Sequence, residues 1–203
     1  FMKVLSAQQM RDLEQAAVDN GATYIKLMEK AGTAAAEALI KYGAESKKVV
    51  IICGKGNNGG DGYVIGRVLK KYSCKVDIIR LGEPRTTDSK LNAEKAIKLD
   101  IAMVNFPEDK ETSFELIKNA DYIVDAVYGI GFRGALDENT AEIAKFVNTS
   151  KAFVMAVDIP SGVGCDDGSV KGECFKANLT VTFTTLKPAH ILYPSICLLY
   201  TSD

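Results

Sequence analysis

Histidine is nearly absent from this sequence: His190 is the one histidine among 203 residues, and its scarcity limits the catalytic chemistry that the chain can support. Without His190, neither a Cys–His nor a Ser–His catalytic pair can form. Its flanking residues Pro188, Ala189 and Ile191 are typical of a packed segment. We therefore expect His190 to be a structural residue.

Cysteine is present, but without a pattern that indicates zinc or disulfides. The five cysteines are odd in number and include no C-x-x-C pair, so that reduced thiols in a cytosol are the default expectation. The segment from Met2 to Met10 also lacks the apolar stretch of a secretory signal. These absences predict a cytoplasmic protein.

Long apolar runs and an excess of one charge are missing as well. No run approaches the roughly 20 apolar residues that a bilayer-spanning helix needs. The formal net charge is −1, so neither a nucleic-acid backbone nor an anionic membrane surface is an expected partner. The whole sequence is 47% hydrophobic and 25% charged, which is the balance of one globular domain of ordinary size.

Short β-branched runs alternate with helical patterns along most of the chain. Two helices come first: Ser6 and Gln9 form a capping-box signature, and a second helix runs from Tyr24 to Leu39, with Gly43 placed to end it. Strands are predicted at 48–53, 76–81, 101–104, 122–126, 153–157 and 179–183, and further helices at 62–72, 89–99, 112–119 and 139–147. The alternation implies parallel strands joined by right-handed crossovers. We expect one α/β domain over residues 1–203, a three-layer Rossmann-like sandwich with a mostly parallel central sheet and two N-terminal helices.

Three unusual loops follow predicted strands, where open parallel sheets bind ligands. The first, Gly54 to Gly62 (GKGNNGGDG), holds five glycines and no apolar side chain. Glycines permit positive φ and close approach of a ligand, and a helix start offers free N–H groups to phosphate. Its match to G-x-G-x-x-G is weak alone, with a plain strand-to-helix turn as the alternative. We interpret it as a ligand loop, not a Walker loop, because no Gly-Lys-Ser/Thr ends it.

The other two loops carry acidic side chains. Asp125 ends an apolar run, where a carboxylate is costly unless it is coordinated or bonded to a buried amide. In the loop that follows, Val127 to Gly134, Arg133 is a candidate phosphate contact. In the third loop Pro160 stiffens the turn, so that Asp158 and Ser161 project in a fixed relation, with an Asx-turn as the alternative for Asp158.

Together the strand ends offer an amide oxygen, carboxylates and a hydroxyl, without imidazole or a thiolate cluster. Hard oxygen ligands suit an alkali or alkaline-earth cation and not zinc or copper. A single carboxylate ligand would favour a monovalent ion.

The motifs GNNGGDG at 56–62, DAVYGIGFRG at 125–134 and VDIPSGV at 157–163 occur in this order, with LMEKAG at 27–32 and TVTFTTLKP at 180–188. They resemble the NAD(P)H-hydrate epimerase family, also called the YjeF N-terminal domain, and the resemblance covers residues 5 to 194. That family interconverts the R and S epimers of hydrated NADH and NADPH. An ADP- or ATP-dependent dehydratase then removes water from the S form, which restores NADH or NADPH. The resemblance thus implies an isomerase of nicotinamide nucleotide repair that is coupled to this dehydratase, with a bound potassium ion (K+) and a homodimeric state.

Residue by residue, the resemblance also implies roles in the site. Substrate contacts are implied at Asn57, Asn58, Gly59, Gly60, Asp61, Gly129, Ile130, Gly131, Phe132, Arg133, Gly134, Ala135 and Asp158. Potassium ligands are implied at Asn58, Asp125 and Ser161. Asp158 is the candidate catalytic residue, because inversion at the hydroxylated ring carbon needs a proton donor and acceptor nearby.

Two segments depart from the family pattern. Leu186 to Ala189 reads Leu-Lys-Pro-Ala where the family usually has Pro-Lys-Pro-Gly, which bears on the local loop shape. Residues 197–203 (CLLYTSD) resemble a sequencing-library transposon end, so we expect a non-native tail there. The natural chain is then expected to continue through at least one more strand, and a longer bifunctional epimerase–dehydratase is one source of such a fragment.

Two other functions stay open. An NAD-dependent dehydrogenase would need an acidic residue about 20 positions beyond the glycines to bind ribose, for which Asp77 or Glu83 are candidates. A non-catalytic dimeric binding scaffold would not need to keep the ion ligands. The presence of Asn58, Asp125, Asp158 and Ser161 favours the enzyme. The sequence leaves open the preference between hydrated NADH (NADHX) and hydrated NADPH (NADPHX).

Overall fold

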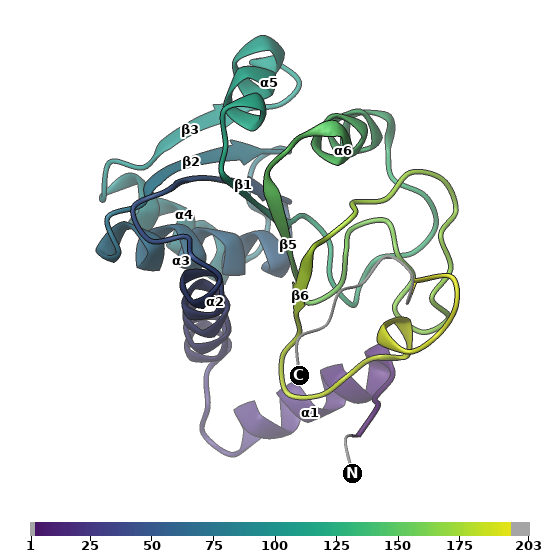
Figure 1. Cartoon of the computed structure of the whole chain (residues 1–203). Coiled ribbons are helices and arrows are strands. Elements are labelled where there is room, and N and C mark those ends of the chain that lie inside the picture. The colour runs from purple at the N-terminus through teal and green to yellow at the C-terminus, as the bar shows by residue number, and fades with distance from the viewer. Residues whose placement is uncertain (1–2, 196–203) are drawn as a thin grey trace.

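The computed structural model describes residues 3–195, and within them six strands form one parallel sheet (Figure 1). The strand order is β3-β2-β1-β4-β5-β6. The strands are β1 (Lys48–Cys53), β2 (Lys75–Arg80), β3 (Ala102–Asn105), β4 (Tyr122–Ala126), β5 (Phe153–Val157) and β6 (Leu179–Val181). The chain reverses its direction of progress across the sheet between β1 and β4, and open α/β sheets bind ligands at such a switch point.

Helices cover both faces of the sheet, which confirms the predicted three-layer α/β fold (Figure 1). Helices α2, α3 and α4 cover one face, and α5 and α6 cover the other. Their bounds are α1 (Ala7–Asp19), α2 (Tyr24–Lys41), α3 (Asn57–Lys71), α4 (Thr87–Ile97), α5 (Lys110–Lys118) and α6 (Glu138–Thr149), and a short 3₁₀ turn, η1, spans Pro188–His190. In the part of the chain that the structure describes, no helix is long and apolar enough to cross a membrane.

The central strand β1 is apolar from Val49 to Cys53 because both of its faces are buried there. Val49 and Ile51 pack with the helices of one face, whereas Val50 and Ile52 pack with α5 and α6 on the other. All four side chains are 0–2% exposed. The two half-cores therefore hold the carboxyl end of β1, and the loop that follows it, in a fixed position.

Helix α1 lies beside the segment that follows β6, away from the main helical layers (Figure 1). The predicted capping box is confirmed: the Ser6 hydroxyl accepts from the Gln9 amide, and the Gln9 side chain accepts from the Ser6 amide. The Ala7 amide donates to Asp166 Oδ1 at 2.7 Å, and the Leu5 amide donates to the Leu186 carbonyl at 2.9 Å. These bonds attach α1 over the carboxyl ends of β5 and β6.

The prediction that α3 begins at Gly62 is wrong, because the helix begins at Asn57. The glycines of this segment serve close packing and not a left-handed backbone. A Cβ on Gly59 would lie 2.0 Å from the Gly54 carbonyl oxygen, and one on Gly60 would lie 2.6 Å from the Met28 side chain. A Cβ on Gly62 would lie 2.7 Å from Cys53 Sγ. The glycine cluster therefore lets the first turns of α3 sit directly against β1 and α2.

Replacing Gly59 by alanine is expected to lower the free energy of unfolding by about 3 kcal/mol or more, because the obstructing atom belongs to the backbone and cannot move aside. Gly131 is the matched control, since nothing lies within 4 Å of a Cβ built there. Gly131→Ala is expected to change stability by no more than about 0.5 kcal/mol. Urea denaturation of the two variants measures the difference. Equal stabilities would show that α3 does not pack so closely against β1.

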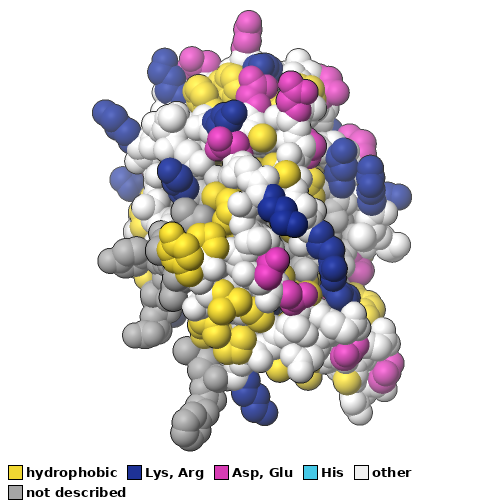
Figure 2. All heavy atoms as spheres, turned by 90° about the vertical axis from the view of Figure 1, so that its right-hand side faces the viewer, with side chains coloured by type: hydrophobic (Ala, Val, Ile, Leu, Met, Phe, Trp, Pro, Cys, Tyr) yellow, Lys and Arg dark blue, Asp and Glu magenta, His cyan; other side chains and the backbone are white. Residues whose placement is uncertain are grey.

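Charges of both signs are interspersed on the face at the right-hand side of Figure 1, which Figure 2 turns toward the viewer. Lys and Arg side chains alternate there with Asp and Glu, and neither sign dominates.

The four cysteines of the described residues are buried and free. Cys197 lies outside these residues, as does the segment 197–203 for which a non-native tail is predicted.

Candidate active site

A cavity of about 990 Å³ opens at the carboxyl ends of the strands and spans the switch point between β1 and β4. All three loops that the sequence singled out reach it. The start of α3 contributes Asn57 and Asn58, the loop after β4 contributes Gly129, and Asp158 follows the end of β5. Its volume lies at the upper end of the range for small-molecule sites, which suits a ligand as long as a dinucleotide.

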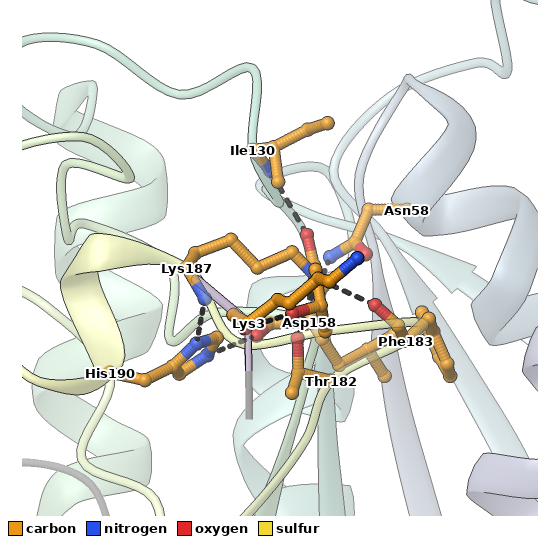
Figure 3. Close-up of polar contacts among 10 residues, drawn as sticks. Lys3, Asn58, Ile130, Asp158, Thr182, Phe183, Lys187 and His190 are labelled. Atoms are coloured by element: carbon orange, nitrogen blue, oxygen red, sulfur yellow. Dashed lines mark hydrogen bonds and ion pairs between the residues drawn. The ribbon is translucent and has the colours of Figure 1, made fainter. Parts of the chain in front are cut away.

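Asp158 is held in the cavity wall by three residues from two segments, the loop after β4 and the segment after β6 (Figure 3). Its Oδ1 lies 2.8 Å from Lys187 Nζ and accepts from the Thr182 hydroxyl at 3.2 Å, while its Oδ2 accepts from the Ile130 amide at 3.2 Å. The residue has a left-handed backbone (φ +70°), which aspartate tolerates better than most residues. None of these bonds is an Asx-turn. The carboxylate therefore has a fixed orientation, with Oδ2 the less engaged oxygen.

Lys187 is the partner of Asp158 that the sequence analysis missed. Its side chain is 1% exposed, and Nζ also donates to the Thr182 hydroxyl at 2.6 Å and to the Phe183 carbonyl at 2.9 Å. All three ammonium hydrogens therefore have acceptors, as a buried lysine requires. The available signal was a lysine next to proline at the end of the motif TVTFTTLKP.

His190 is a buried structural residue, as predicted, and it contacts the backbone of both members of the ion pair. Its Nδ1 accepts from the Lys187 amide at 2.9 Å, and its Nε2 lies 2.9 Å from the Asp158 carbonyl oxygen. Burial lowers the pKa of His190, so the ring is neutral near pH 7 and Nε2 carries the proton. One imidazole thus joins the backbones of Asp158 and Lys187.

Two further carboxylic acids line the same end of the cavity. They are Asp61, on the second turn of α3, and Glu14, which α1 contributes and which the sequence analysis missed. Desolvation raises the pKa of Asp61 well above its usual value, and the charges of Asp158 and Glu14 raise it further. Burial raises the pKa of Glu14 in the same way, again assisted by Asp158. The site therefore combines a paired carboxylate with acids that hold protons more strongly than usual.

The predicted potassium ligands lie at the ends of three adjacent strands. Asp125 is 0% exposed; its Oδ2 accepts from the Ser161 amide at 2.7 Å, and its Oδ1 accepts from the Ser161 hydroxyl at 2.6 Å. Burial raises the pKa of Asp125 to about 6, although the bonds from Ser161 and Val127 lower it. Asn58 reaches a different partner, since its Nδ2 donates to the Val157 carbonyl at 3.3 Å.

This donor set fits a monovalent cation. In the described residues Asp125 has no cationic partner, so a bound positive charge would compensate a carboxylate that is otherwise costly to bury. The same residues contain no cluster of three or more His, Cys, Asp or Glu side chains able to hold a metal, which leaves one carboxylate with neutral oxygens. Hard neutral oxygens and a single negative charge match an alkali ion better than a divalent one.

The loop after β4 approaches the cavity through its backbone. A Cβ on Gly129 would lie 2.9 Å from Asp158 Oδ2 and 3.3 Å from Asn58 Oδ1, so glycine leaves room for ligand atoms between these two polar groups. The Tyr128 and Phe132 rings pack beside it at a centroid distance of 5.1 Å. The loop after β4 therefore lines the cavity at the switch point.

The structure divides the predicted substrate-contacting residues into two groups. Those that line the cavity are Asn57, Asn58, Asp61, Gly129, Ile130, Gly131, Phe132 and Asp158. Gly59 and Gly60 are buried behind them, and Arg133 and Gly134 line a separate pocket of about 240 Å³. Ala135 lines neither pocket. Contact of these residues with substrate stays a prediction.

The fold and the site define an α/β protein with a dinucleotide-sized cavity at the switch point of a Rossmann-like sheet. The family model described as YjeF-related protein N-terminus matches residues 25–189, and the chain belongs to this family. It is 36% identical over 183 residues to an NAD(P)H-hydrate epimerase of Limosilactobacillus fermentum, covering 90% of this chain and 86% of that protein.

Longer relatives and a solved structure are also similar to this chain. The bifunctional NAD(P)H-hydrate repair enzyme Nnr of Coxiella burnetii is 36% identical over 198 residues, which is 94% of this chain and 38% of the enzyme. The chain thus spans well under half the length of that bifunctional relative. The crystal structure of yeast ynu0 superposes with a TM-score of 0.84 at 25% identity, covering 93% of this chain and 83% of the yeast chain.

Proposed function

We propose that this chain is an isomerase that interconverts the R and S epimers of hydrated NADH and NADPH in nicotinamide nucleotide repair. The observation that carries the proposal is the Asp158–Lys187 pair, which lies in the wall of a dinucleotide-sized cavity. Membership of a family whose relatives include named NAD(P)H-hydrate epimerases supports it.

The reaction needs both a proton donor and a proton acceptor. The hydroxyl lies on a ring carbon next to nitrogen, so the nitrogen lone pair expels it once it is protonated and leaves as water. Asp158 is ionised beside Lys187, so Asp61, which holds its proton more strongly than usual, gives this proton, and Asp158 Oδ2 takes one from the water that adds to the opposite face. A proton that passes from Asp158 to Asp61 through water then restores both acids. Lys187 stabilises the ionised stage of Asp158, because its ammonium lies 2.8 Å from Oδ1.

The same proposal includes a potassium ion held by Asn58, Asp125 and Ser161. When bound, the ion would supply positive charge beside the nucleotide phosphates. The free amides at the start of α3, whose N-cap Gly56 offers no side-chain bond, face the same phosphates and favour negative charge. These groups bind and orient the nucleotide, while Asp158 takes part in proton transfer.

The test begins with a mixture of the two NADPHX epimers, an S-specific dehydratase and ATP. When the S form is exhausted, the protein is added and the loss of the residual R form is followed. The proposal requires a rate that rises in proportion to the concentration of this protein. No acceleration, with binding of the nucleotide retained, would overturn the proposal in favour of a non-catalytic binding scaffold.

Potassium is expected to raise the melting temperature of the protein, because an ion that binds only the folded state stabilises it. The comparison is between potassium chloride and choline chloride at equal ionic strength. Asp125→Asn is expected to abolish the difference, since it removes the single carboxylate of the donor set. Equal melting temperatures for the unsubstituted protein in the two salts would contradict the ion site.

This proposal also includes three predictions about partners, oligomeric state and location. They are functional coupling to an ADP- or ATP-dependent dehydratase, a homodimeric state and a cytoplasmic location. The bifunctional repair enzymes among the relatives support the first.

A further inference from the structure

The position of the reacting ring determines where the rest of the nucleotide lies; this step rests on the proposed function. With the ring at Asp158 on β5, the phosphates lie at the start of α3, between β1 and β4. The adenosine then extends across β1 toward β2, because the cavity continues in that direction to Leu81 and Arg85. In Rossmann-like folds this end of the second strand contacts the adenosine ribose.

The two acidic residues that follow the glycine motif at the expected spacing, Glu83 and Asp77, are not placed to bind a free ribose hydroxyl. Glu83 has a side chain that is 75% exposed, pairs with Arg80 at 3.2 Å and does not line the cavity. Asp77, the other candidate, lies within β2 beside Val50 and also does not line the cavity. Neither residue therefore favours a nucleotide with an unmodified 2′-hydroxyl.

Two basic side chains lie at the end of β2 instead. Lys55 and Arg85 line the cavity, and the Arg85 amide donates to the Lys55 carbonyl at 2.8 Å, so their backbones are joined. The Lys55 side chain crosses Gly82, where a Cβ would lie 2.3 Å from Lys55 Cε and 3.2 Å from Nζ. Gly82 therefore allows the ammonium to lie directly at the end of the strand.

Neither cation has an acidic partner among the described residues, in contrast to the neighbouring Arg80. The acidic neighbours are Glu108, an exposed residue that lines the same part of the cavity, and Asp137. Asp137 is already engaged by the Thr140 amide at 3.1 Å and hydroxyl at 2.7 Å. Lys55 and Arg85 are thus available to a ligand anion.

We propose that Lys55 and Arg85 bind the 2′-phosphate of the adenosine ribose, so that the chain prefers NADPHX over NADHX. Arginine binds phosphate through a planar set of N–H donors, and lysine adds a point charge. A 2′-hydroxyl offers neither charge nor comparable acceptors to these groups.

The binding test uses NADP+ and NAD+, which differ only in the 2′-phosphate, and isothermal titration calorimetry on the full chain. We expect NADP+ to bind about tenfold more tightly or better, and Arg85→Ala or Lys55→Ala to remove most of this advantage. Lys90→Ala is the control for charge, because Lys90 is an exposed α4 residue outside the cavity. Equal binding of the two nucleotides, or an advantage that survives both substitutions, would overturn the assignment.

A kinetic arm separates this inference from the proposed function. In the stalled dehydratase assay, Arg85→Ala is expected to raise KM for NADPHX about tenfold more than KM for NADHX. An NADP+ preference without any epimerase activity would refute the proposed function and keep the 2′-phosphate site. Epimerase activity with equal KM values for the two hydrates would refute the site and keep the function.

Discussion

Replacing Asp158 by asparagine is expected to lower the turnover of NAD(P)HX epimers about a hundredfold or more, because general acid–base catalysis typically contributes that much. Asparagine keeps the shape of the side chain and an oxygen for Lys187, but it cannot carry the proton. The affinity for NADP+ is expected to change little. The stalled dehydratase assay measures turnover, and calorimetry measures affinity.

Asp100→Asn is the matched control for this substitution. Asp100 is exposed and also has a left-handed backbone (φ +52°), so the same chemical change is made at the same kind of backbone position outside the cavity. It is expected to leave turnover unaltered. If Asp158→Asn retained full turnover with intact binding, Asp158 would not be the proton carrier.

Replacing Lys187 by methionine is expected to cost about 3 kcal/mol of folding free energy, because it leaves the Asp158 carboxylate without its buried partner. Turnover is expected to fall strongly as well, since the ionised stage of Asp158 loses its counter-charge. Urea denaturation gives the stability, and the exposed Lys90→Met is the control for loss of a lysine.

The double variant Asp158→Asn/Lys187→Met distinguishes the ion pair from packing. If the two residues interact as the 2.8 Å distance indicates, the double variant loses less stability than the sum of the single losses. Strict additivity would mean that Lys187 supports the site by filling space, and the proposed stabilisation of ionised Asp158 would then be wrong.

The fold was predictable because its central strands are mainly apolar and buried on both faces. The predicted bounds of β1 and β4 agree with the structure. The strand predicted at 179–183 was less well placed, since β6 ends at Val181. Thr182 and Phe183 lie beyond the end of the strand, and their oxygens accept from Lys187, a long-range contact that no local pattern displays.

Helix α3 shows where the interpretation of glycine failed. The sequence predicts a loop at Gly59 and Gly60, because glycine tolerates positive φ. The structure places both in the helix, with no room for a Cβ against Gly54 and Met28. Whether a glycine serves a turn or close packing depends on its neighbours in space, and these come from other elements.

The sequence by itself determined the α/β order of elements, the oxygen-rich strand ends and the scarcity of imidazole chemistry, because each depends on residue type and spacing along one segment. Only the tertiary structure decided that Asp158 pairs with Lys187, that Glu14 joins the site, and that cations occupy the end of β2. These features are distances between side chains on separate elements. Packing sets such distances, because it determines which polar groups are buried together and must satisfy one another.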